Sequence, residues 1–155
     1  MTATVHILVG AAITKKTSSP FLAFFLGILS HLILDLIPHK NLILSRKIAA
    51  YLICALDPIL GFLILFVLKY PFNLTNLFGI LGAISPDLFS VFQFTFRIKF
   101  FEPLYKFHHY LHWFENKKDL YDPTPSKINP WVGILPQIFI SLISILWILN
   151  FDISL

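Results

Sequence analysis

Five ionisable side chains lie inside otherwise apolar stretches of the sequence, where an uncompensated charge is costly. They are His6, His31, Asp35, Asp57 and Asp87. An Asp at the centre of a membrane helix costs about 2.5 to 3.5 kcal/mol, so the three carboxylates carry a penalty on the order of 10 kcal/mol unless they are paired or bind metal. A cost of this size indicates a functional role, although a single buried histidine is more often a packing residue.

The best spacing for metal binding is between His31 and Asp35. Residues four apart lie on one face of a helix, where two side chains can hold the same ion. Pro38 then ends the helix and is followed by His39, which adds a further imidazole. The run therefore predicts a metal-binding helix end.

A second histidine cluster comprises His108, His109 and His112, with spacings of four and three. It is expected to close the site from another helix, and the alternative is an interfacial belt beside Tyr110 and Trp113. Imidazole and carboxylate without thiolate suit zinc best, and manganese and iron are also compatible. The predicted ligands of a divalent metal are His6, His31, Asp35, His39, Asp87, His108, His109 and His112.

Four apolar stretches have about the length of a membrane-spanning helix. They cover residues 20–38, 48–68, 74–96 and 131–149, and a rise of about 1.5 Å per residue brings each close to the ~30 Å hydrocarbon core. Residues 2–13 have a helical pattern but are too short to span, so they predict a half-helix packed against the next helix. The predicted fold is all-α, a polytopic transmembrane bundle in one domain over residues 1–155.

Antiparallel hairpins of these helices bring the polar residues to one depth. Spacing from each connecting turn puts His6, His31, Asp57 and Asp87 in one layer, with Asp35 one helical turn from His31. We therefore expect His6, His31, Asp35 and Asp87 to converge within reach of a shared metal ion.

Two of the carboxylates lie next to prolines. Asp57 precedes Pro58, and Asp87 follows Pro86, a pattern typical of a helix start. A helix break within a membrane is tolerated where it lines a protein cavity. Asp57 and Asp87 are therefore each expected at a broken helix, and the alternative for Asp57 is a simple helix cap.

The amino-acid composition indicates that the surface of the protein faces lipid rather than water. Of 155 residues, 57% are hydrophobic and only 13% are charged, which is too few charges for a water-facing surface. A formal charge of +4 without a nucleic-acid motif fits an anionic membrane surface rather than nucleic acid. The single cysteine, Cys54, excludes a disulfide framework. Membrane lipid is the expected partner, and the oligomeric state stays open.

Residues 97–129 are more polar and contain six of the twelve Lys and Arg residues. The apolar stripe Phe100, Leu104, Phe107, Leu111 and Phe114 predicts an amphipathic helix on the membrane surface. Together with residues 39–47, this region has nine basic residues, against three on the other side. The positive-inside rule then predicts a multi-pass protein of the inner (plasma) membrane with its His/Asp site toward the cytoplasm.

Four segments resemble small bacterial membrane-bound metal-dependent hydrolases: VHILVGAA, SHLILDLIPH, LGAISPDL and FHHYLHW. The resemblance implies that His6, Asp87 and members of the 108–112 cluster are ligands. The run from His31 to His39 is similar to the metal-binding helix of zinc-dependent phospholipase C and related nucleases, which implies that His31, Asp35 and His39 are ligands of a polynuclear metal site. The sequence differs from the first family's usual P-D-x-D, because Leu88 and Phe89 follow Asp87.

The favoured hypothesis is a membrane-bound metal-dependent hydrolase of a phosphoester, either a lipid or a lipid-linked one. Asp57 is the predicted catalytic general base, with Asp35 as the alternative. A metal or proton carrier would use similar residues, but the uniformly apolar last helix favours a one-sided site. A third hypothesis is a non-catalytic protein that is stabilised by a structural metal ion.

Overall fold

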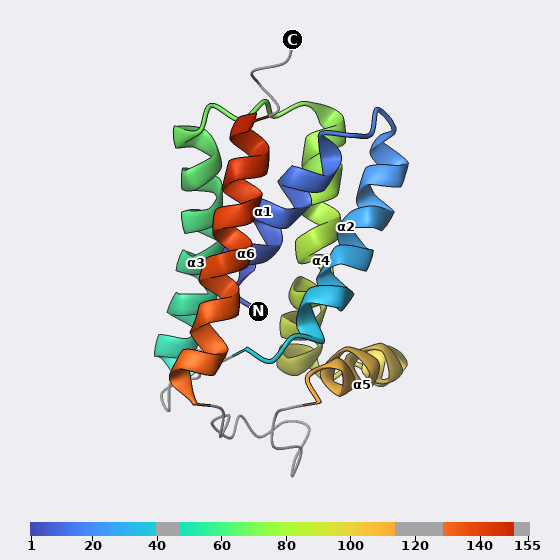
Figure 1. Cartoon of the computed structure of the whole chain (residues 1–155). Helices are drawn as coiled ribbons and strands as arrows, with labels where there is room; N and C mark the ends of the chain where they lie inside the picture. The colour runs from blue at the N-terminus through green and yellow to red at the C-terminus, as the bar shows by residue number, and fades with distance from the viewer. Residues whose placement is uncertain (40–46, 114–128, 151–155) are drawn as a thin grey trace.

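The computed structural model describes residues 1–39, 47–113 and 129–150, and over these residues the protein is helical, without a β-strand (Figure 1). The elements are α1 (Ala3–Thr14), α2 (Pro20–Asp35), α3 (Lys47–Val67), α4 (Leu74–Phe96), the 3-10 helix η1 (Lys99–Phe101), α5 (Glu102–Leu111) and α6 (Pro130–Asn150). The predicted all-α fold is confirmed, with a helix at each of the four long apolar stretches.

The short helix α1 forms the centre of the bundle. It packs against α2, α3, α4 and α6, and Figure 1 shows it crossing obliquely between them. Its residues are mostly apolar or small all round, which is typical of a buried helix, and Ile7, Leu8 and Ala11 are fully buried. The short helix predicted over residues 2–13 is thus found, and it contacts four helices rather than α2 alone.

The closest helix crossing joins α2 to α4 through glycines. A Cβ atom on Gly27 would collide with the backbone of Gly79, Gly82 and Ala83 in α4, and one on Gly82 would collide with the backbone of Phe24. Small residues let two helix backbones approach in this way, as at interfaces between membrane helices. The crossing also brings the next turn of α2, which contains a histidine, against the backbone of α4.

The prediction of helix breaks at Asp57 and Asp87 is wrong, because Pro58 lies inside α3 and Pro86 lies inside α4. A proline removes the N–H group that would bond to the carbonyl four residues earlier. For Pro86 that carbonyl belongs to Gly82, and the hydroxyl of Ser85 donates to it at 2.9 Å. A neighbouring side chain thus replaces the missing donor, and the helix continues.

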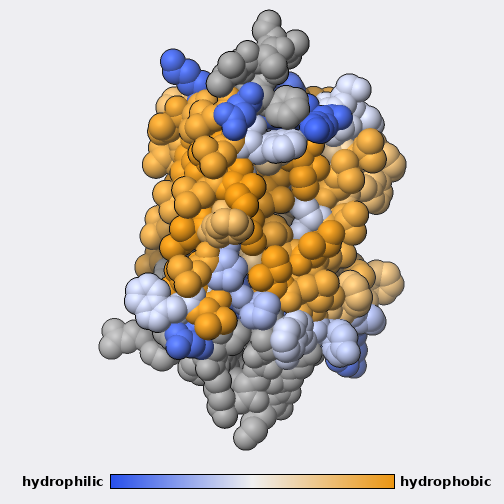
Figure 2. Space-filling model, viewed as in Figure 1, coloured by the Kyte–Doolittle hydropathy of each residue, from blue (hydrophilic) through white to orange (hydrophobic). Residues whose placement is uncertain are grey.

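The surface is apolar over most of the bundle. Figure 2 shows a hydrophobic face with hydrophilic residues gathered toward its two ends, and large side chains such as Phe21, Phe66 and Trp131 are at least 70% exposed. Two helices, Leu74–Gln93 and Trp131–Asn150, are long and apolar enough to cross a membrane. Shorter apolar helices cover Ala3–Thr14, Pro20–Asp35 and Ala55–Val67.

The amphipathic helix predicted after residue 97 is α5. Arg97 adopts a left-handed backbone conformation with φ 51° and ends α4, so that the chain turns and α5 packs against α4 and α2. Phe100, Leu104 and Phe107 of the predicted stripe are exposed, whereas Phe114 lies outside the described residues. The other side of α5 faces the bundle and contains His108, and the buried His112 follows directly after the helix.

Candidate metal centre

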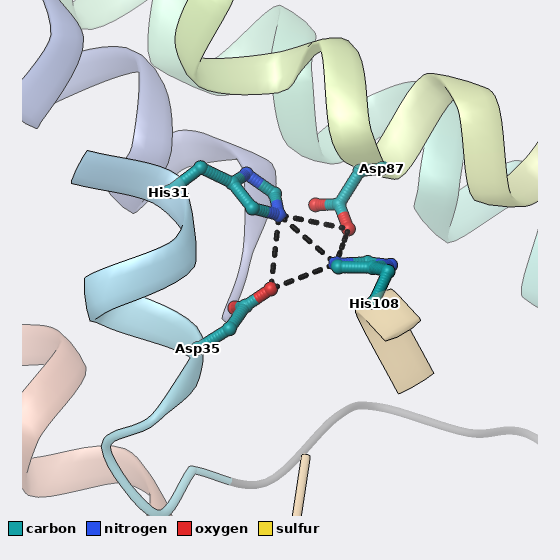
Figure 3. Close-up of side chains that lie close together, drawn as sticks. All are labelled: His31, Asp35, Asp87 and His108. Atoms are coloured by element: carbon teal, nitrogen blue, oxygen red, sulfur yellow. Dashed lines mark hydrogen bonds and ion pairs between the residues drawn. The ribbon is translucent and has the colours of Figure 1, made fainter. Parts of the chain in front are cut away.

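Four predicted ligands from three helices converge at one point (Figure 3). They are His31 and Asp35 of α2, Asp87 of α4 and His108 of α5, and one donor atom from each lies within 4.8 Å of the others. The i,i+4 spacing in α2 places the first two on one helical face, and the close α2–α4 crossing brings Asp87 to them. This group, called the primary cluster below, is mostly buried.

The shortest contacts in the primary cluster centre on Asp35. Its Oδ2 lies 2.9 Å from Nε2 of His31 and 2.9 Å from Nε2 of His108, and the two Nε2 atoms are 3.1 Å apart. Oδ1 of Asp87 is farther away, at 3.7 Å from Nε2 of His31 and 3.6 Å from Nε2 of His108. The four donor atoms therefore surround a small common space.

Groups outside the cluster orient both imidazoles. Nδ1 of His31 lies 2.6 Å from the carbonyl oxygen of Ala83, and since a carbonyl only accepts, Nδ1 must donate. Nδ1 of His108 lies 2.5 Å from the hydroxyl of Ser90. Histidines that bind metals commonly have one ring nitrogen fixed by such a partner, so that the other is directed at the ion.

The same geometry requires positive charge among the donor atoms. With its Nδ1 protonated, a neutral His31 presents a lone pair at Nε2 toward the Asp35 carboxylate, and two acceptors at 2.9 Å repel each other. The side chains of His31 and Asp35 are both 0% exposed, so water does not screen this repulsion. Either protons on the imidazoles or a metal cation must compensate the charge.

His6 of α1 is a further imidazole that lies next to the primary cluster. Its ring stacks on that of His31 with centroids 3.9 Å apart, and its Nε2 lies 3.3 Å from Oδ1 of Asp35 and 4.0 Å from Oδ2 of Asp87. Both His6 ring nitrogens are buried without a hydrogen-bond partner. A buried imidazole in this state is costly unless it has a further ligand. The expected convergence of His6, His31, Asp35 and Asp87 is therefore found.

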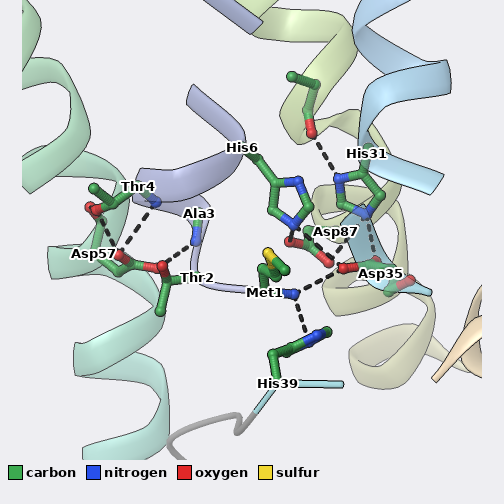
Figure 4. Close-up of polar contacts among 12 residues, drawn as sticks. Met1, Thr2, Ala3, Thr4, His6, His31, Asp35, His39, Asp57 and Asp87 are labelled. Carbon is green, nitrogen blue, oxygen red and sulfur yellow. Dashed lines mark hydrogen bonds and ion pairs between the residues drawn. The ribbon is translucent and has the colours of Figure 1, made fainter. Parts of the chain in front are cut away.

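A second group of donors shares Asp35 and adds His39 and His112, again with atoms within 4.8 Å of one another. Figure 4 shows the ammonium group of Met1 between Asp35 and His39; it donates to Oδ1 of Asp35 at 2.7 Å and to Nε2 of His39 at 2.6 Å. Burial, together with the charge of this ammonium group, lowers the pKa of His39 to about 3. The His39 imidazole is therefore neutral near pH 7.

Two predicted site residues lie apart from both groups. The carboxylate of Asp57 accepts hydrogen bonds from the backbone N–H groups of Ala3 and Thr4 and from the Thr4 hydroxyl, at 2.5, 3.2 and 2.6 Å (Figure 4). Asp57 thus caps the N-terminus of α1 rather than facing the cluster, which corrects its assignment as the general base. His109 stacks on Tyr105 instead, with ring centroids 6.2 Å apart.

Two groups that hold the imidazoles were not predicted from the sequence. Ser90 lies three residues after Asp87, so its place on the same helical face was a usable signal. The carbonyl of Ala83 gives no sequence signal, because any residue supplies one and only the helix crossing selects it.

Comparison with protein-family models, with curated proteins and with solved structures finds no match for this chain. Its chemistry is therefore inferred from the site. The arrangement can hold a metal ion through nitrogen and oxygen atoms.

Proposed function

We propose that this protein is a multi-pass integral protein of the plasma membrane that hydrolyses a phosphoester of a lipid or lipid-linked substrate with a divalent metal ion, most simply zinc. The observation that carries the proposal is the primary cluster: two imidazole Nε2 atoms and two carboxylates converge, with both Nδ1 atoms in contact with outer oxygen atoms. The resemblance of the short sequence motifs to membrane-bound metal-dependent hydrolases agrees with this chemistry.

Membrane embedding is supported by the exposed apolar surface and by the position of the charges. The basic residues Lys15, Lys16 and Lys69 follow the C-terminal ends of α1 and α3. Helix α5 and the C-terminal end of α2, which contains Asp35, lie at the opposite end of the bundle (Figure 1). The excess of basic residues in segments 39–47 and 97–129 supports a cytoplasmic position for that end.

The chain's own residues suit a hydrolytic site. When bound, a divalent ion lowers the pKa of a water molecule and polarises a phosphoryl oxygen. Oδ2 of Asp35 lies 2.9 Å from Nε2 of both His31 and His108, so these three atoms can hold the same ion. Contacts of the two Nδ1 atoms with Ala83 and Ser90 orient the imidazoles. The carboxylate of Asp87 makes the longest contacts, which leaves it best placed to orient a water molecule and accept its proton.

The partial exposure of the primary cluster, next to apolar residues of α5, supports a lipid substrate. The side chain of Asp87 is 33% exposed, whereas those of His31 and Asp35 are fully buried. The neighbouring helix α5 presents exposed Leu104 and Phe107, which are suited to the apolar–polar boundary of a bilayer. A phosphate group at that boundary would approach Asp87 while its acyl or prenyl chain stays in lipid.

The test is hydrolysis by protein purified in detergent, stripped of metal and reloaded with zinc or manganese. The substrates are a phosphatidic acid, a polyprenyl diphosphate and water-soluble nitrophenyl phosphate. We expect phosphate release from a lipid substrate only with metal, and loss of release and of bound metal in His108→Ala. His109→Ala is the matched control, because this adjacent histidine lies outside both donor groups, and it should retain metal and activity.

A structural metal ion is the second candidate, and the complete burial of His31 and Asp35 favours it. It predicts that metal removal lowers the melting temperature of the protein and that no substrate is hydrolysed. Wild-type protein with bound metal and no activity on the whole panel would therefore replace the hydrolase by this candidate.

A further inference from the structure

A groove of about 470 Å³ lies on the surface of the bundle between α2 and α6. It is lined by Ala12 and Ile13 of α1, by Leu26 of α2, and by Ile143 and Trp147 of α6. Figure 1 shows α1 between the other two helices, toward the end of the bundle opposite α5. The groove is therefore separate from the metal centre.

Most of the groove is apolar. Ser144 is a polar lining residue, but its hydroxyl donates to the carbonyl of Ile140 in the same helix at 2.9 Å, so its hydrogen-bonding need is met. Ile143 and Trp147 are 48% and 41% exposed, and α6 is one of the helices long and apolar enough to cross a membrane. A hydrocarbon chain can contact such a surface without leaving a polar group unpaired.

One end of the groove is positively charged. Lys16 lines it, with Nζ 4.9 Å from the centroid of the Trp147 ring, within the range of a cation–π contact. The ammonium group of the neighbouring Lys15 donates to the carbonyl of Ile148 near the end of α6. Lysine and tryptophan at the end of an apolar helix are typical of the headgroup level of a bilayer.

We propose that this groove binds an anionic phospholipid, with one acyl chain between α2 and α6 and the phosphate beside the ammonium group of Lys16. In the proposed orientation, this lipid belongs to the outer leaflet. The inference rests on the proposed membrane embedding and needs neither hydrolysis nor bound metal. Because α6 packs mainly against α1, a lipid in the groove would also connect α6 to α2.

A second copy of the chain is a less suitable occupant than a lipid. Two copies with the same orientation in a membrane are related by an axis along the membrane normal, which places Lys16 of both copies at the same depth. Ammonium groups that face each other across an interface repel, whereas a phosphate group is attracted. The charge at the end of the groove therefore favours an anionic lipid.

The test is fluorescence quenching of Trp147, because this indole lines the groove. Metal-free protein with Trp113→Phe and Trp131→Phe is reconstituted in mixed vesicles of phosphatidylglycerol and phosphatidylcholine, of which one at a time has brominated acyl chains. We expect brominated phosphatidylglycerol to quench Trp147 more strongly at equal mole fraction. The relative binding constant should be about 5, as for one lysine beside an anionic headgroup.

Two pairs of variants separate the headgroup from the acyl chain. Lys16→Gln should bring the relative binding constant to about 1, whereas Lys69→Gln should leave it unchanged, because Lys69 lies at the same end of the bundle but does not line the groove. Ser144→Leu should fill the groove and lower the preference as well. Ser141→Leu is its matched control in the same helix and should retain the preference.

Equal quenching by the two lipids, or an unchanged preference in Lys16→Gln, would overturn the lipid site. Weak quenching by both lipids, with a disulfide-linked dimer of Ile143→Cys in protein without Cys54, would assign the groove to a second copy instead. Lys16 is exposed, so Lys16→Gln should fold, and circular dichroism checks this. Hydrolysis by metal-loaded protein is measured separately and decides the proposed function independently of this site.

Discussion

Replacement of Asp57 should destabilise the centre of the bundle. The N-terminus of α1 lies inside the protein, and its own N-cap residue, Thr2, makes no side-chain cap. Asp57 of α3 supplies the acceptors for the N–H groups of Ala3 and Thr4, while Gln137 of α6 accepts from the N–H of Thr2 at 3.1 Å. Two neighbouring helices thus cap α1 from outside.

The size of the effect follows from the donors that lose their acceptor. In Asp57→Ala the backbone N–H groups of Ala3 and Thr4 become unsatisfied, and each such partly buried group costs about 1 to 2 kcal/mol. The hydroxyl of Thr4 can still donate to the backbone carbonyl of residue 57, at 2.7 Å. We therefore expect a loss of about 2 to 4 kcal/mol in the free energy of unfolding. Asp57→Asn retains one acceptor and should lose about half as much.

The assay is thermal unfolding in detergent, monitored by circular dichroism. At about 2 to 4 °C per kcal/mol for a chain of this size, Asp57→Ala should lower the melting temperature by roughly 5 to 15 °C. The folded fraction should retain its metal, because Asp57 does not contact the primary cluster. Asp57→Asn with wild-type stability and metal but without turnover would refute this reasoning and restore Asp57 as the general base.

Two further predictions concern packing and orientation. Gly82→Ala should destabilise the protein by about 1 to 3 kcal/mol, because the added methyl group collides with the backbone of Phe24 in α2. Gly61→Ala should cost less, because its methyl group meets the Ile7 side chain and the Thr4 backbone at longer distances; chemical denaturation that ranks the two variants the other way would contradict the helix crossing. Lys106→Cys, in protein without Cys54, should react with a membrane-impermeant maleimide only after the cells are opened. Lys69→Cys in the same background should already react in intact spheroplasts, and the reverse pattern would invert the proposed orientation.

The sequence predicts how far along each helix the site residues lie, but it does not predict which side of the helix each side chain faces. Counting residues from connecting turns places His6, His31 and Asp87 at one level, and these side chains do converge. Asp57 was assigned to the same layer by the same count, yet its carboxylate faces the N-terminus of α1. Spacing fixes how far along a helix a residue lies, whereas packing between helices decides which way it points.

The histidine cluster illustrates the same limit within one helix. His108 and His112 are four residues apart and both face the bundle, but His109 is three residues from His112 and was equally acceptable as a partner. Only the packing of α5 against α4 and α2 selects the inward pair. The central place of α1 was likewise not predictable, because a helix that is apolar all round does not specify its neighbours.

The most direct test of the metal centre is X-ray absorption at the edge of the metal that copurifies with the protein from membranes. We predict a shell of nitrogen and oxygen ligands at about 2.0 to 2.2 Å, with imidazole scattering and without sulfur, and the loss of that signal in Asp35→Asn. Protein that purifies without metal and takes up none on dialysis, or a metal with a sulfur ligand at about 2.3 Å, would contradict the assignment of the His/Asp cluster as a metal centre.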